Sequence, residues 1–444
     1  MASNWRTCKI GDVFTLTPGF AFKSSDFIDH GTPVLKIKNV KAGEVVFNDL
    51  SYVADSFVQS RSNFLVQHGD ILISLSGNRI DGSKDTWVGK VAQFRRNGNY
   101  LLNQRVGILR PKTDVTIDTR CSAYLLGSEQ YQQLFISIAT SSGGQANLSS
   151  AQVLNAEIRL PPFAEQQAIA CILGALDDKI ALNHRRNSGL EAIARAIFQS
   201  WFVDFAPVQA KAEGRKPAGL PPELMALFPT SFEESELGEI PKGWHIGTVG
   251  DVVEINGWTL GKRDELDEIN YIEISEVMRG EVANITRYVR GEEPGRARRR
   301  LRHGDTAIST VRPDRGAYFL CLEPPTSLIA STGFAVLTAR GGHWAFVHVL
   351  TTRNEFGQEL GRLADGGAYP AVRPELISAR PVVIPANGSV LSAFEKLTQP
   401  LFLKVEAERK ESRTLAALRD TLLPKLISGE LRVPDAERIV GMVV

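Results

Sequence analysis

Residues 163–205, FAEQQAIACILGALDDKIALNHRRNSGLEAIARAIFQSWFVDF, carry the most regular pattern in this chain. Apolar residues recur there at alternating steps of four and three, with two asparagines at the centre of the series: Ile169, Leu173, Leu176, Ile180, Asn183, Asn187, Leu190, Ala194, Ile197 and Trp201. This heptad spacing predicts a narrow apolar seam along one long helix. A helix over about 165–203 would be close to 60 Å long, at about 1.5 Å per residue.

A second seam of the same kind lies near the end of the chain. Its residues, again polar at the centre, are Phe394, Leu397, Leu401, Val405, Glu408, Ser412, Leu415, Leu422 and Leu426. Two such seams predict an antiparallel coiled coil within one chain, whose buried polar residues fix the register at some cost in stability. The alternative is a pair of ordinary core helices.

Each long helix follows one copy of an imperfect internal repeat. WRTCKIGDVFTL (5–16) matches WHIGTVGDVVEI (244–255), VQHGDILIS (66–74) matches LRHGDTAIS (301–309), and NQRVGIL (103–109) lies opposite STGFAVL (331–337). SSGGQANLSSAQVLNAEIRLPP (141–162) lies opposite ADGGAYPAVRPELISARPVVIP (364–385). The matched segments keep their order, while the difference in residue number between the two members of each pair decreases along the chain. This indicates a duplication with changes in loop length rather than chance similarity.

Short apolar runs bounded by Gly, Asp and Asn, such as TPVLKIKNV, DILISLSG and RVGILRP, predict strands within each repeat. We therefore expect an α+β protein built of two similar mixed α/β domains and two long antiparallel helices that form an intramolecular coiled coil. The expected segments are a first domain, 1–162; a long helix, 163–205; a connector rich in Pro, Gly and charge, 206–240; a second domain, 241–386; a second long helix, 387–430; and a tail, 431–444.

Composition narrows the class of protein. The 444 residues include 51 Lys and Arg, 50 Asp and Glu, and four cysteines with no CxxC pair, a composition typical of a globular protein in a reducing cytosol and not of a disulfide framework or a structural zinc site. No signal peptide and no apolar run of about 18 residues occurs, so we expect a cytoplasmic protein without a membrane partner. With a net charge of +1, any DNA-binding surface must be local or shared with partners.

Catalytic motifs are absent or incomplete. LPPF (160–163) lacks the polar first residue of the amino-methyltransferase loop, GNRIDGSK (77–84) ends unlike a phosphate loop, and VRPDRG (311–316) lacks the downstream acidic-x-Lys pair of nuclease sites. No HExxH or Gly-x-Ser-x-Gly pattern occurs. We therefore expect no catalytic residue, no metal site and no bound cofactor in this chain.

Polar loops at matching places in the two repeats are the candidate site. Their amide, hydroxyl and guanidinium groups are those that read base edges in duplex DNA. In the first repeat they are Ser76, Gly77, Asn78, Arg79, Asn103, Gln104, Arg105, Gly143, Gly144, Gln145 and Asn147. In the second they are Thr310, Arg312, Arg315, Ser331, Thr332, Gly366, Gly367, Tyr369 and Arg373. The alternative is that these are generic polar loops.

Two further surfaces are candidates for binding. The run RGEEPGRARRRLR (290–302) is the densest basic segment, and it either grips phosphates or is a solvated loop. Apolar residues that flank the first helix, Ile193, Phe198, Trp201 and Phe202, are expected to be uncovered and to bind a partner protein.

The chain resembles the specificity subunits of type I restriction-modification systems. LPPFAEQQAIACILGALDDKIALN (160–183) and LEAIARAIFQSWFVDFAPV (190–208) are similar to the central conserved region of that family, and LRDTLLPKLISGELRV (418–433) is similar to its C-terminal one. NQRVGIL and SGGQANLS resemble its target-recognition signatures. The second repeat departs more, with STGFAVL and GGAYPAV in those places.

The resemblance implies two target recognition domains, related by a pseudo-twofold internal repeat, that each read one half of a bipartite site in double-stranded DNA. It further implies that the helices set the spacer and dock two modification subunits. Those subunits bind S-adenosylmethionine and flip and methylate an adenine in each half-site. Restriction subunits that use ATP and Mg join in some systems. The alternatives are a methylation-only system, a stand-alone repressor-like binder and a coiled-coil scaffold without a DNA role.

Overall fold

The computed structural model describes residues 5–79, 86–142, 145–215, 219–261, 264–367 and 370–441. The chain divides into two compact units, Met1–Leu182 with Glu411–Val444 (unit 1) and Asn183–Lys410 (unit 2). Both divisions fall inside the long helices rather than at the domain boundaries expected from the sequence. The reason is that each repeat packs its apolar core onto stretches of both helices, so repeat and helix stretches fold as one body.

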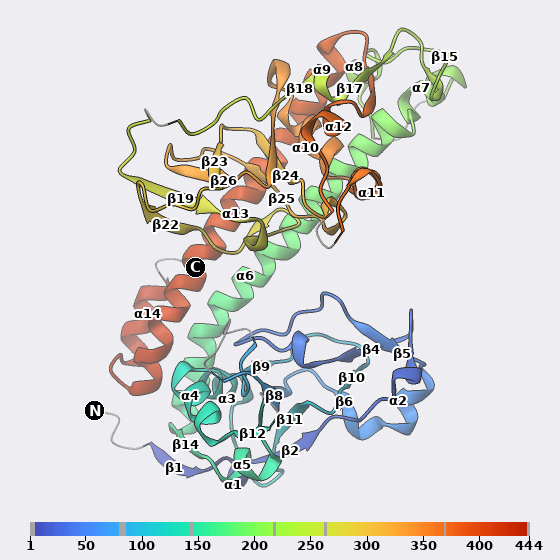
Figure 1. Ribbon diagram of the computed structural model, residues 1–444. Helices are drawn as coiled ribbons and strands as arrows, with labels where there is room; N and C mark the ends of the chain where they lie inside the picture. Colours follow the sequence, from blue (N-terminus) through green and yellow to red (C-terminus); the bar gives the residue numbers. More distant parts are fainter. Residues whose placement is uncertain are drawn as a thin grey trace. The chain divides into compact units, whose positions relative to one another are not determined.

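Unit 1 contains the first repeat. Strand β1 (Arg6–Lys9) pairs antiparallel with β14 (Glu157–Leu160) and leads into the short helix α1 (Ile10–Val13). One sheet has the order β2-β11-β7-β9, with bounds Phe14–Pro18, Val106–Pro111, Ile71–Ser74 and Val91–Gln93. A second has the order β3-β5-β4-β10-β6, with bounds Phe27–Ile28, Ser51–Val53, Thr32–Leu35, Tyr100–Leu102 and Leu65–Val66. Helices α3 (Thr119–Leu126), α4 (Glu129–Ile138) and α5 (Ser150–Asn155) complete this repeat (Figure 1).

Unit 2 contains the second repeat with the same topology. Strand β17 (His245–Thr248) pairs with β28 (Pro381–Ile384) and leads into α9 (Val249–Val252). The matching sheet has the order β18-β27-β24-β25, with bounds Val253–Ile255, Phe334–Ala339, Asp305–Ser309 and Tyr318–Cys321. The other has the order β22-β19-β26-β23, with bounds Thr286–Val289, Glu268–Ile272, Leu328–Ser331 and Ala297–Arg300. Its helices are α10 (Trp344–Thr352), α11 (Asn354–Leu363) and α12 (Pro374–Ser378). The predicted duplication and mixed α/β fold are confirmed.

Strand pairing corrects one of the sequence anchors. Arg6 pairs with Leu160 in the first repeat, and His245, its equivalent, pairs with Ile384 in the second. Leu160 therefore corresponds to Ile384, whereas the alignment of 141–162 with 364–385 placed it opposite Val383. The alignment was anchored on the Gly-Gly pairs, but the second repeat has one more residue between that pair and the strand. A slip of one residue would turn every side chain of the strand to the opposite face.

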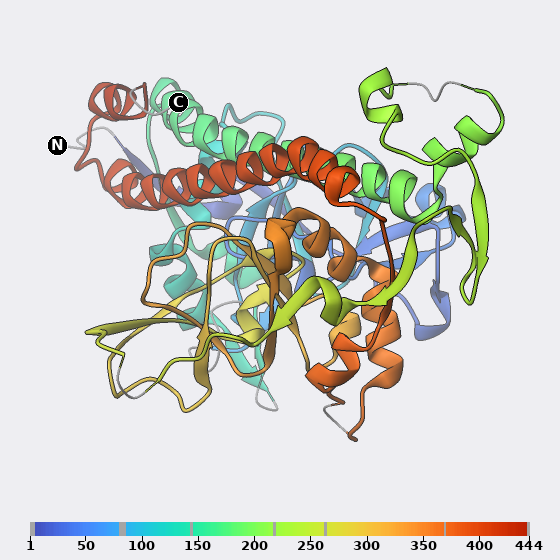
Figure 2. The ribbon, with the colours of Figure 1, turned by 90° about the horizontal axis from the view of Figure 1, so that it is seen from above.

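The long helices α6 (Phe163–Phe198) and α13 (Gly388–Ser428) confirm the predicted helix pair. In unit 1, Lys179 and Asp177 form ion pairs with Glu411 and Arg419, at 3.3 and 2.8 Å. In unit 2, Arg186 pairs with Glu408 at 3.1 Å, and the rings of Phe198 and Phe394 lie 6.0 Å apart. Residue numbers rise along one helix as they fall along the other, so the stretches that lie side by side in each unit are antiparallel (Figure 2).

The polar centre of the seam is buried as predicted. Asn183, Asn187, Glu408 and Ser412 are all at most 8% exposed, and the Asn183 side-chain amide donates a hydrogen bond to the Glu408 carbonyl oxygen at 3.4 Å. Leu397 was wrongly assigned to the seam, because it is 38% exposed. The next buried residue of the seam after Phe394 is Thr398, four residues further on, and not Leu397, which is three residues further on.

The segments expected to be a connector and a tail are folded. Residues 206–240 contain α7 (Ala206–Ala212), α8 (Pro222–Met225), strand β15 (Phe232–Ser235) and most of β16 (Gly238–Pro241). Their composition concealed apolar residues that are buried in unit 2, such as Val208 and Phe228. In unit 1, helix α14 (Val433–Gly441) buries Ala436 and Val440. No helix in the part of the chain that the structure describes is long and apolar enough to cross a membrane.

Candidate nucleic-acid interface

Three polar loops of the first repeat meet at one place. The Leu75 backbone N–H donates to the Arg105 carbonyl oxygen, and the Leu148 N–H donates to the Leu75 carbonyl oxygen, both at 2.8 Å. Short strands continue this contact, because β8 (Ser76–Gly77) pairs with β13 (Gln145–Asn147), which pairs with β12 (Thr140–Ser142). The loops that the sequence singled out are therefore held together by the backbone.

Side chains in these loops divide into structural and exposed groups. The Ser76 hydroxyl donates to Asn147 Oδ1 at 2.7 Å, and the Asn78 amide donates to Thr86 Oγ1 at 3.1 Å, so these polar groups stabilise the loops. Arg105 Nη1 donates to Gln145 Oε1 at 2.8 Å, and both side chains are exposed. The remaining candidates are the half-buried Asn103, the exposed Gln104, and the exposed Arg79, whose Nη2 donates to the Ala139 carbonyl oxygen at 2.6 Å. Gln104, Arg105 and Gln145 are thus the groups best placed to reach a ligand.

The second repeat joins its loops through the same pair of backbone hydrogen bonds. The Thr310 N–H donates to the Gly333 carbonyl oxygen and the Val372 N–H donates to the Thr310 carbonyl oxygen, again both at 2.8 Å. A third bond, from the Arg312 N–H to the Pro370 carbonyl oxygen at 2.9 Å, ties the same two loops further along. The matching geometry places the candidate loops of both repeats at equivalent points of the fold.

The exposed chemistry of the second repeat is different. Arg315, Thr332 and Arg373 are exposed, and Arg373 immediately precedes α12. Arg312 is half-buried and has a left-handed backbone with φ of 47°, an uncommon conformation for a residue other than glycine. Thr310 donates its hydroxyl to the Gly333 carbonyl oxygen at 2.9 Å, and Ser331 is buried. Tyr369, with Gly143 and Gly144 of the first repeat, lies outside the described residues.

A hairpin beside these loops was missed by the sequence analysis. In each repeat the parallel central strand runs into a 3-10 turn, Ile37–Asn39 or Ile274–Glu276, and then into a Gly-Glu-Val segment at 43–45 or 280–282. The Gly43 N–H donates to the Val91 carbonyl oxygen and the Gly280 N–H donates to the Tyr318 carbonyl oxygen, both at 2.8 Å. The Gly-Glu-Val tripeptide that occurs in both repeats could have revealed this hairpin from the sequence. Because the glycine of each copy donates to Val91 or to Tyr318, these two residues occupy equivalent positions.

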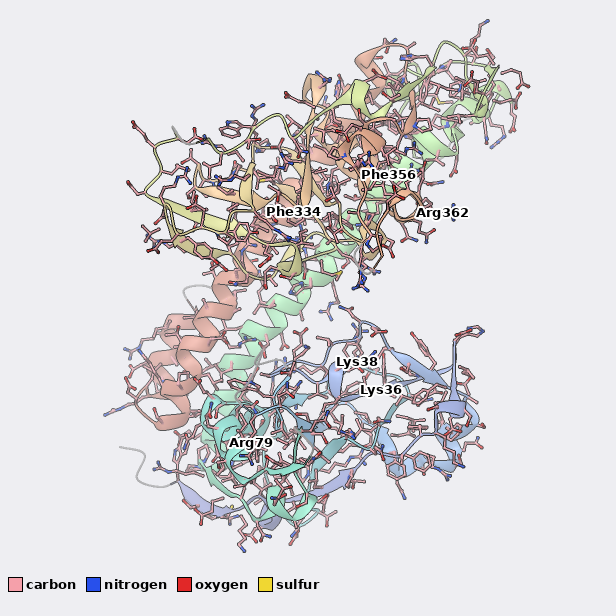
Figure 3. All side chains as sticks on the ribbon, in the orientation of Figure 1. Lys36, Lys38, Arg79, Phe334, Phe356 and Arg362 are labelled. Carbon is pink, nitrogen blue, oxygen red and sulfur yellow. The ribbon has the colours of Figure 1, made fainter. Side chains whose placement is uncertain are left out.

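Charge differs between the two hairpins. Lys36 and Lys38 of the first repeat (Figure 3) correspond to Glu273 and Ser275 of the second. The Lys36 ammonium group lies 3.7 Å from the centroid of the Phe27 ring, and burial, with the neighbouring Lys38, lowers its pKa. The Asn103 backbone N–H donates a hydrogen bond to the Leu35 carbonyl oxygen at 3.0 Å, and this bond connects the basic hairpin to the loop cluster. Lys38 forms an ion pair with Asp49, so of these two lysines Lys36 is the one that adds positive charge beside the candidate loops.

Three of the six arginines in the basic run at 290–302 lie beside carboxylates of the fold. Arg290 pairs with Glu293, Arg300 pairs with Asp264 at 3.1 Å, and Arg302 lies 4.0 Å from Glu254. The guanidinium groups of Arg300 and Arg302 also stack on the ring of Trp258. These contacts favour a structural role for those arginines over a phosphate grip, while Arg296 is exposed.

Most of the expected partner patch is buried. Phe198, Trp201 and Phe202 are at most 7% exposed, because they pack against aromatic residues of the second repeat; the Phe202 and Phe346 rings lie 4.9 Å apart. The expectation that they are uncovered is therefore wrong. Ile193 is 51% exposed, and it alone of the four keeps a side chain available to a partner.

Metal-ligating and nucleophilic side chains are scattered within the described residues. These residues contain no group of three or more His, Cys, Asp or Glu that could hold a metal ion. Cys121 and Cys321 are buried, and burial raises the pKa of both thiols well above the usual range, so neither is poised to act as a thiolate nucleophile.

Comparison with known proteins gives the class. Residues 2–192 match the family described as the Type I restriction modification DNA specificity domain. Over 498 aligned residues the chain is 24% identical to the Type I restriction enzyme HindI specificity subunit of Haemophilus influenzae, which covers 97% of this chain and 100% of the relative. It is 25% identical over 300 residues to the MjaIX specificity subunit of Methanocaldococcus jannaschii, covering 66% of this chain and 65% of the relative.

A solved structure has the same fold. The S subunit of a type I restriction-modification system from M. genitalium superposes with a TM-score of 0.56 at 17% identity, over 95% of this chain and 96% of the other. The resemblance to type I specificity subunits that the sequence predicted is confirmed: this chain is similar to one of them over 97% of its length, and residues 2–192 match the family's DNA specificity domain.

Proposed function

We propose that this chain is the non-catalytic specificity subunit of a type I restriction-modification complex, in which each repeat reads one half of a bipartite site in double-stranded DNA. The observation that supports this most strongly is the loop geometry. Both repeats close three loops with the same two backbone hydrogen bonds, yet the side chains that the loops expose differ. One scaffold with two sets of base-reading groups suits two different half-sites.

The antiparallel helices support the finer proposal that they set the spacer and dock two modification subunits. Those partners would supply S-adenosylmethionine and the chemistry of adenine methylation, and restriction subunits, where a system has them, would supply ATP- and Mg-dependent cleavage. The chain itself would bind none of these cofactors, and its location would be cytoplasmic. A system that only methylates remains an alternative.

A stand-alone sequence-specific DNA-binding protein is the second candidate. One observation favours it: Phe198, Trp201 and Phe202 are covered by the second repeat and leave no large aromatic patch for a partner to cover. A chain that stays monomeric and binds its site tightly without modification subunits would support this candidate.

Loop variants test the assignment of half-sites. Arg105→Ala is expected to weaken binding through the first half-site alone, and Arg312→Ala through the second alone, each by about 1 to 3 kcal/mol for a base contact. Affinities of duplexes with either half-site scrambled would separate the two effects. An equal loss on every sequence would instead identify a phosphate contact. Lys396→Ala, at an exposed position on α13, is the control for loss of one positive charge.

A register change tests the ruler role of the helices. Deleting four residues around Asn183 removes about one helical turn and displaces the buried polar centre from Glu408 and Ser412. We expect the variant to recognise both half-sites with an altered gap, or to lose the bipartite site. Selection from a duplex library with variable gaps would measure this, and an unchanged gap in a folded variant would contradict the proposal.

A further inference from the structure

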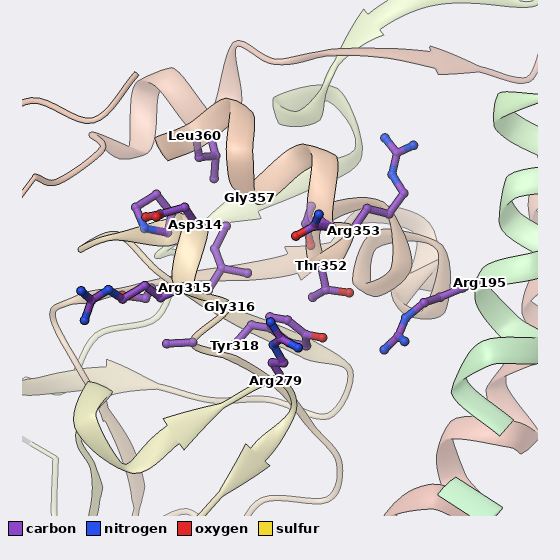
Figure 4. Close-up of a pocket in the computed structure, with 16 residues that line it drawn as sticks. Arg195, Arg279, Asp314, Arg315, Gly316, Tyr318, Thr352, Arg353, Gly357 and Leu360 are labelled. Atoms are coloured by element: carbon purple, nitrogen blue, oxygen red, sulfur yellow. The ribbon is translucent and has the colours of Figure 1, made fainter. Parts of the chain in front are cut away.

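A cavity of about 410 Å³ lies within unit 2, in the second repeat and against helix α6 (Figure 4). Four of the side chains that line it are arginines, Arg195, Arg279, Arg315 and Arg353, and the single acidic one is Asp314. Arg195, Arg279 and Arg315 are exposed and Arg353 is half-buried, so the hollow presents several accessible guanidinium groups of the kind that bind anions. The cavity is therefore a candidate anion site.

The contacts inside the cavity leave much of this charge unbalanced. Arg195 pairs with Glu191 at 2.9 Å, but Glu191 also takes Arg409 at 2.9 Å, so one carboxylate serves two arginines. Among the described residues no ion pair reaches Arg279, whereas the Arg353 guanidinium donates to the Leu350 carbonyl oxygen at 3.4 Å, lies over the Phe198 ring and has Glu355 and Glu359 nearby. The Arg409 Nε atom is buried without a hydrogen-bond partner.

Electrostatic effects on neighbouring groups agree with this excess of positive charge. Burial is the main cause that lowers the pKa of the His348 imidazole, to about 3, and Arg409 and Arg195 lower it further. Burial raises the pKa of the Tyr318 phenol, while Arg195, Arg279 and Arg409 each act to lower it. The phenol of Tyr318 thus lies near three arginines, whose effect on its pKa Glu191 opposes.

Figure 4 shows which groups face the hollow. The guanidinium groups of Arg195 and Arg279 reach toward the side of the cavity where Tyr318 and Thr352 lie, whereas Arg315 points away from it. Guanidinium forks and a phenol donate several hydrogen bonds in a fixed geometry, which suits the oxygen atoms of a phosphate group.

At three compared positions the first repeat lacks the side chains of this site. Arg279 corresponds to Ala42, because each precedes the glycine of the repeated Gly-Glu-Val segment, and Tyr318 corresponds to Val91 through the matching hydrogen bonds from those glycines. Arg353 corresponds to Ser128, since each is the residue immediately before the second helix of its pair. The charge at these positions is thus specific to the second repeat and not a requirement of the fold.

We propose that the cavity binds a phosphodiester group of the DNA backbone next to the half-site read by the second repeat. This rests on the proposed function. The occupant is assigned to DNA because Pro313, Asp314, Arg315 and Gly316, which form one wall, belong to the same loop as Arg312 and continue into the candidate interface. Arg279 and Arg195 hold the phosphate oxygens, and the Tyr318 hydroxyl donates to one of them. The contact fixes position and carries no sequence information.

Salt dependence of DNA binding tests this inference. Arg279→Gln in the full chain is expected to weaken binding to a labelled duplex of random sequence about tenfold, and to reduce the slope of log K against log salt by about 0.9, the value for one phosphate contact. Arg279→Lys should restore most of the slope, and Tyr318→Phe should weaken binding less. Lys396→Ala, exposed on α13, should leave the slope unchanged. Equal thermal unfolding of the variants controls for folding.

Several outcomes would overturn the assignment. An Arg279→Gln protein with the wild-type slope would exclude a DNA phosphate, and calorimetric binding of inorganic phosphate lost in that variant would then identify a site for a free anion. Loss of a co-purifying partner with DNA binding intact would identify an acidic protein segment as the occupant. If the wild-type chain binds no duplex at all, the proposed function itself fails. An unchanged salt slope in the Arg279→Gln variant, by contrast, contradicts only the phosphate site.

Discussion

Both units join the repeat to the long helices through an apolar core, but unit 1 adds an ionic contact and unit 2 adds an aromatic cluster. In unit 1 the carboxylate of Asp177 on α6 accepts hydrogen bonds from Arg95 at 3.0 Å, from Arg419 of α13 at 2.8 Å and from the Tyr124 hydroxyl. In unit 2 the corresponding contact is aromatic, with ring centroids of Phe198, Phe202, Phe346 and Phe394 about 5 to 6.4 Å apart. The same topology thus has an apolar core in both units, with different additional contacts in each.

The turns that precede strands β7 and β24 also differ in chemistry between the two repeats. Asp70 and Asp305 each accept the equivalent backbone N–H, from Gln67 or Arg302, at 2.7 Å. Arg110 then forms an ion pair with Asp70 at 2.7 Å, whereas the matching position in the second repeat is Thr338, which donates a neutral hydroxyl to Asp305 at 2.7 Å. The backbone geometry of the duplication is retained while the electrostatics of each copy changes.

The largest expected effect is on the aromatic contact of unit 2. Phe394 is fully buried at the centre of the ring cluster, so Phe394→Ala should reduce the free energy of unfolding by about 3 to 5 kcal/mol. Urea denaturation would measure the change. Leu403→Ala on the same helix, 43% exposed, is the matched control and should change it by less than about 0.5 kcal/mol. Similar small losses at both positions would show that this cluster does not hold unit 2 together.

A smaller, pH-dependent loss is expected in unit 1. Burial opposes ionisation of Asp177, but the hydrogen bonds from Tyr124 and Arg419 outweigh it and lower the pKa of that carboxyl. The stabilisation is therefore present above the unfolded-state pKa near 4 and disappears as pH falls through the lowered folded-state pKa. Asp177→Asn should destabilise by about 2 to 3 kcal/mol at neutral pH and much less in acid.

The neighbouring Asp178 provides the control for this prediction. Its carboxylate is 64% exposed and pairs with Arg120, so Asp178→Asn should change the free energy of unfolding by less than about 1 kcal/mol. Denaturant titrations of the wild type and both variants across acid and neutral pH would compare them. A loss for Asp177→Asn that does not vary with pH would contradict an ionic contact in unit 1.

The smallest predicted effect has the opposite sign. Burial raises the pKa of Asp305, in spite of the hydrogen bonds from Thr338 and Arg302. A raised folded-state pKa means that stability is lost as pH rises through it, so ionised Asp305 weakens the second repeat at neutral pH. Asp305→Asn should raise stability by up to about 1 kcal/mol at pH 7 and leave it unchanged in acid. A clear destabilisation at pH 7 would show that the ionised carboxylate is needed.

Periodic and repeated features were predictable from the sequence. The heptad seams located both long helices, and the His-Gly-Asp and Trp…Gly-Asp anchors located equivalent strands, because each pattern reflects local backbone geometry. What failed depended on tertiary contacts. Whether Phe198 and Trp201 face a partner or the second repeat is decided by the packing of α10 and α13, which their own spacing does not encode.

The candidate site was predictable only in part. The loops could be found because they recur at matching places, but the division between structural Ser76 and exposed Arg105 required the hydrogen bonds of the folded chain. Arg279 and Tyr318 were not found, since the residues of the cavity come from separate segments and the repeat pattern at these two positions is broken. Side chains that occur in only one of the two repeats appear in an alignment of the repeats as mismatched residues, and a mismatch does not by itself indicate a site.

The bases to which this chain directs a methyltransferase test its proposed role most directly. The measurement is to co-express it with modification subunits in a host free of adenine methylation and to map modified adenines by long-read sequencing, with the chain omitted as the control. A single bipartite motif with a fixed gap, lost when the chain is omitted, is the predicted result. A continuous motif, or the same motif without the chain, would contradict the claim that two repeats read two halves of one site.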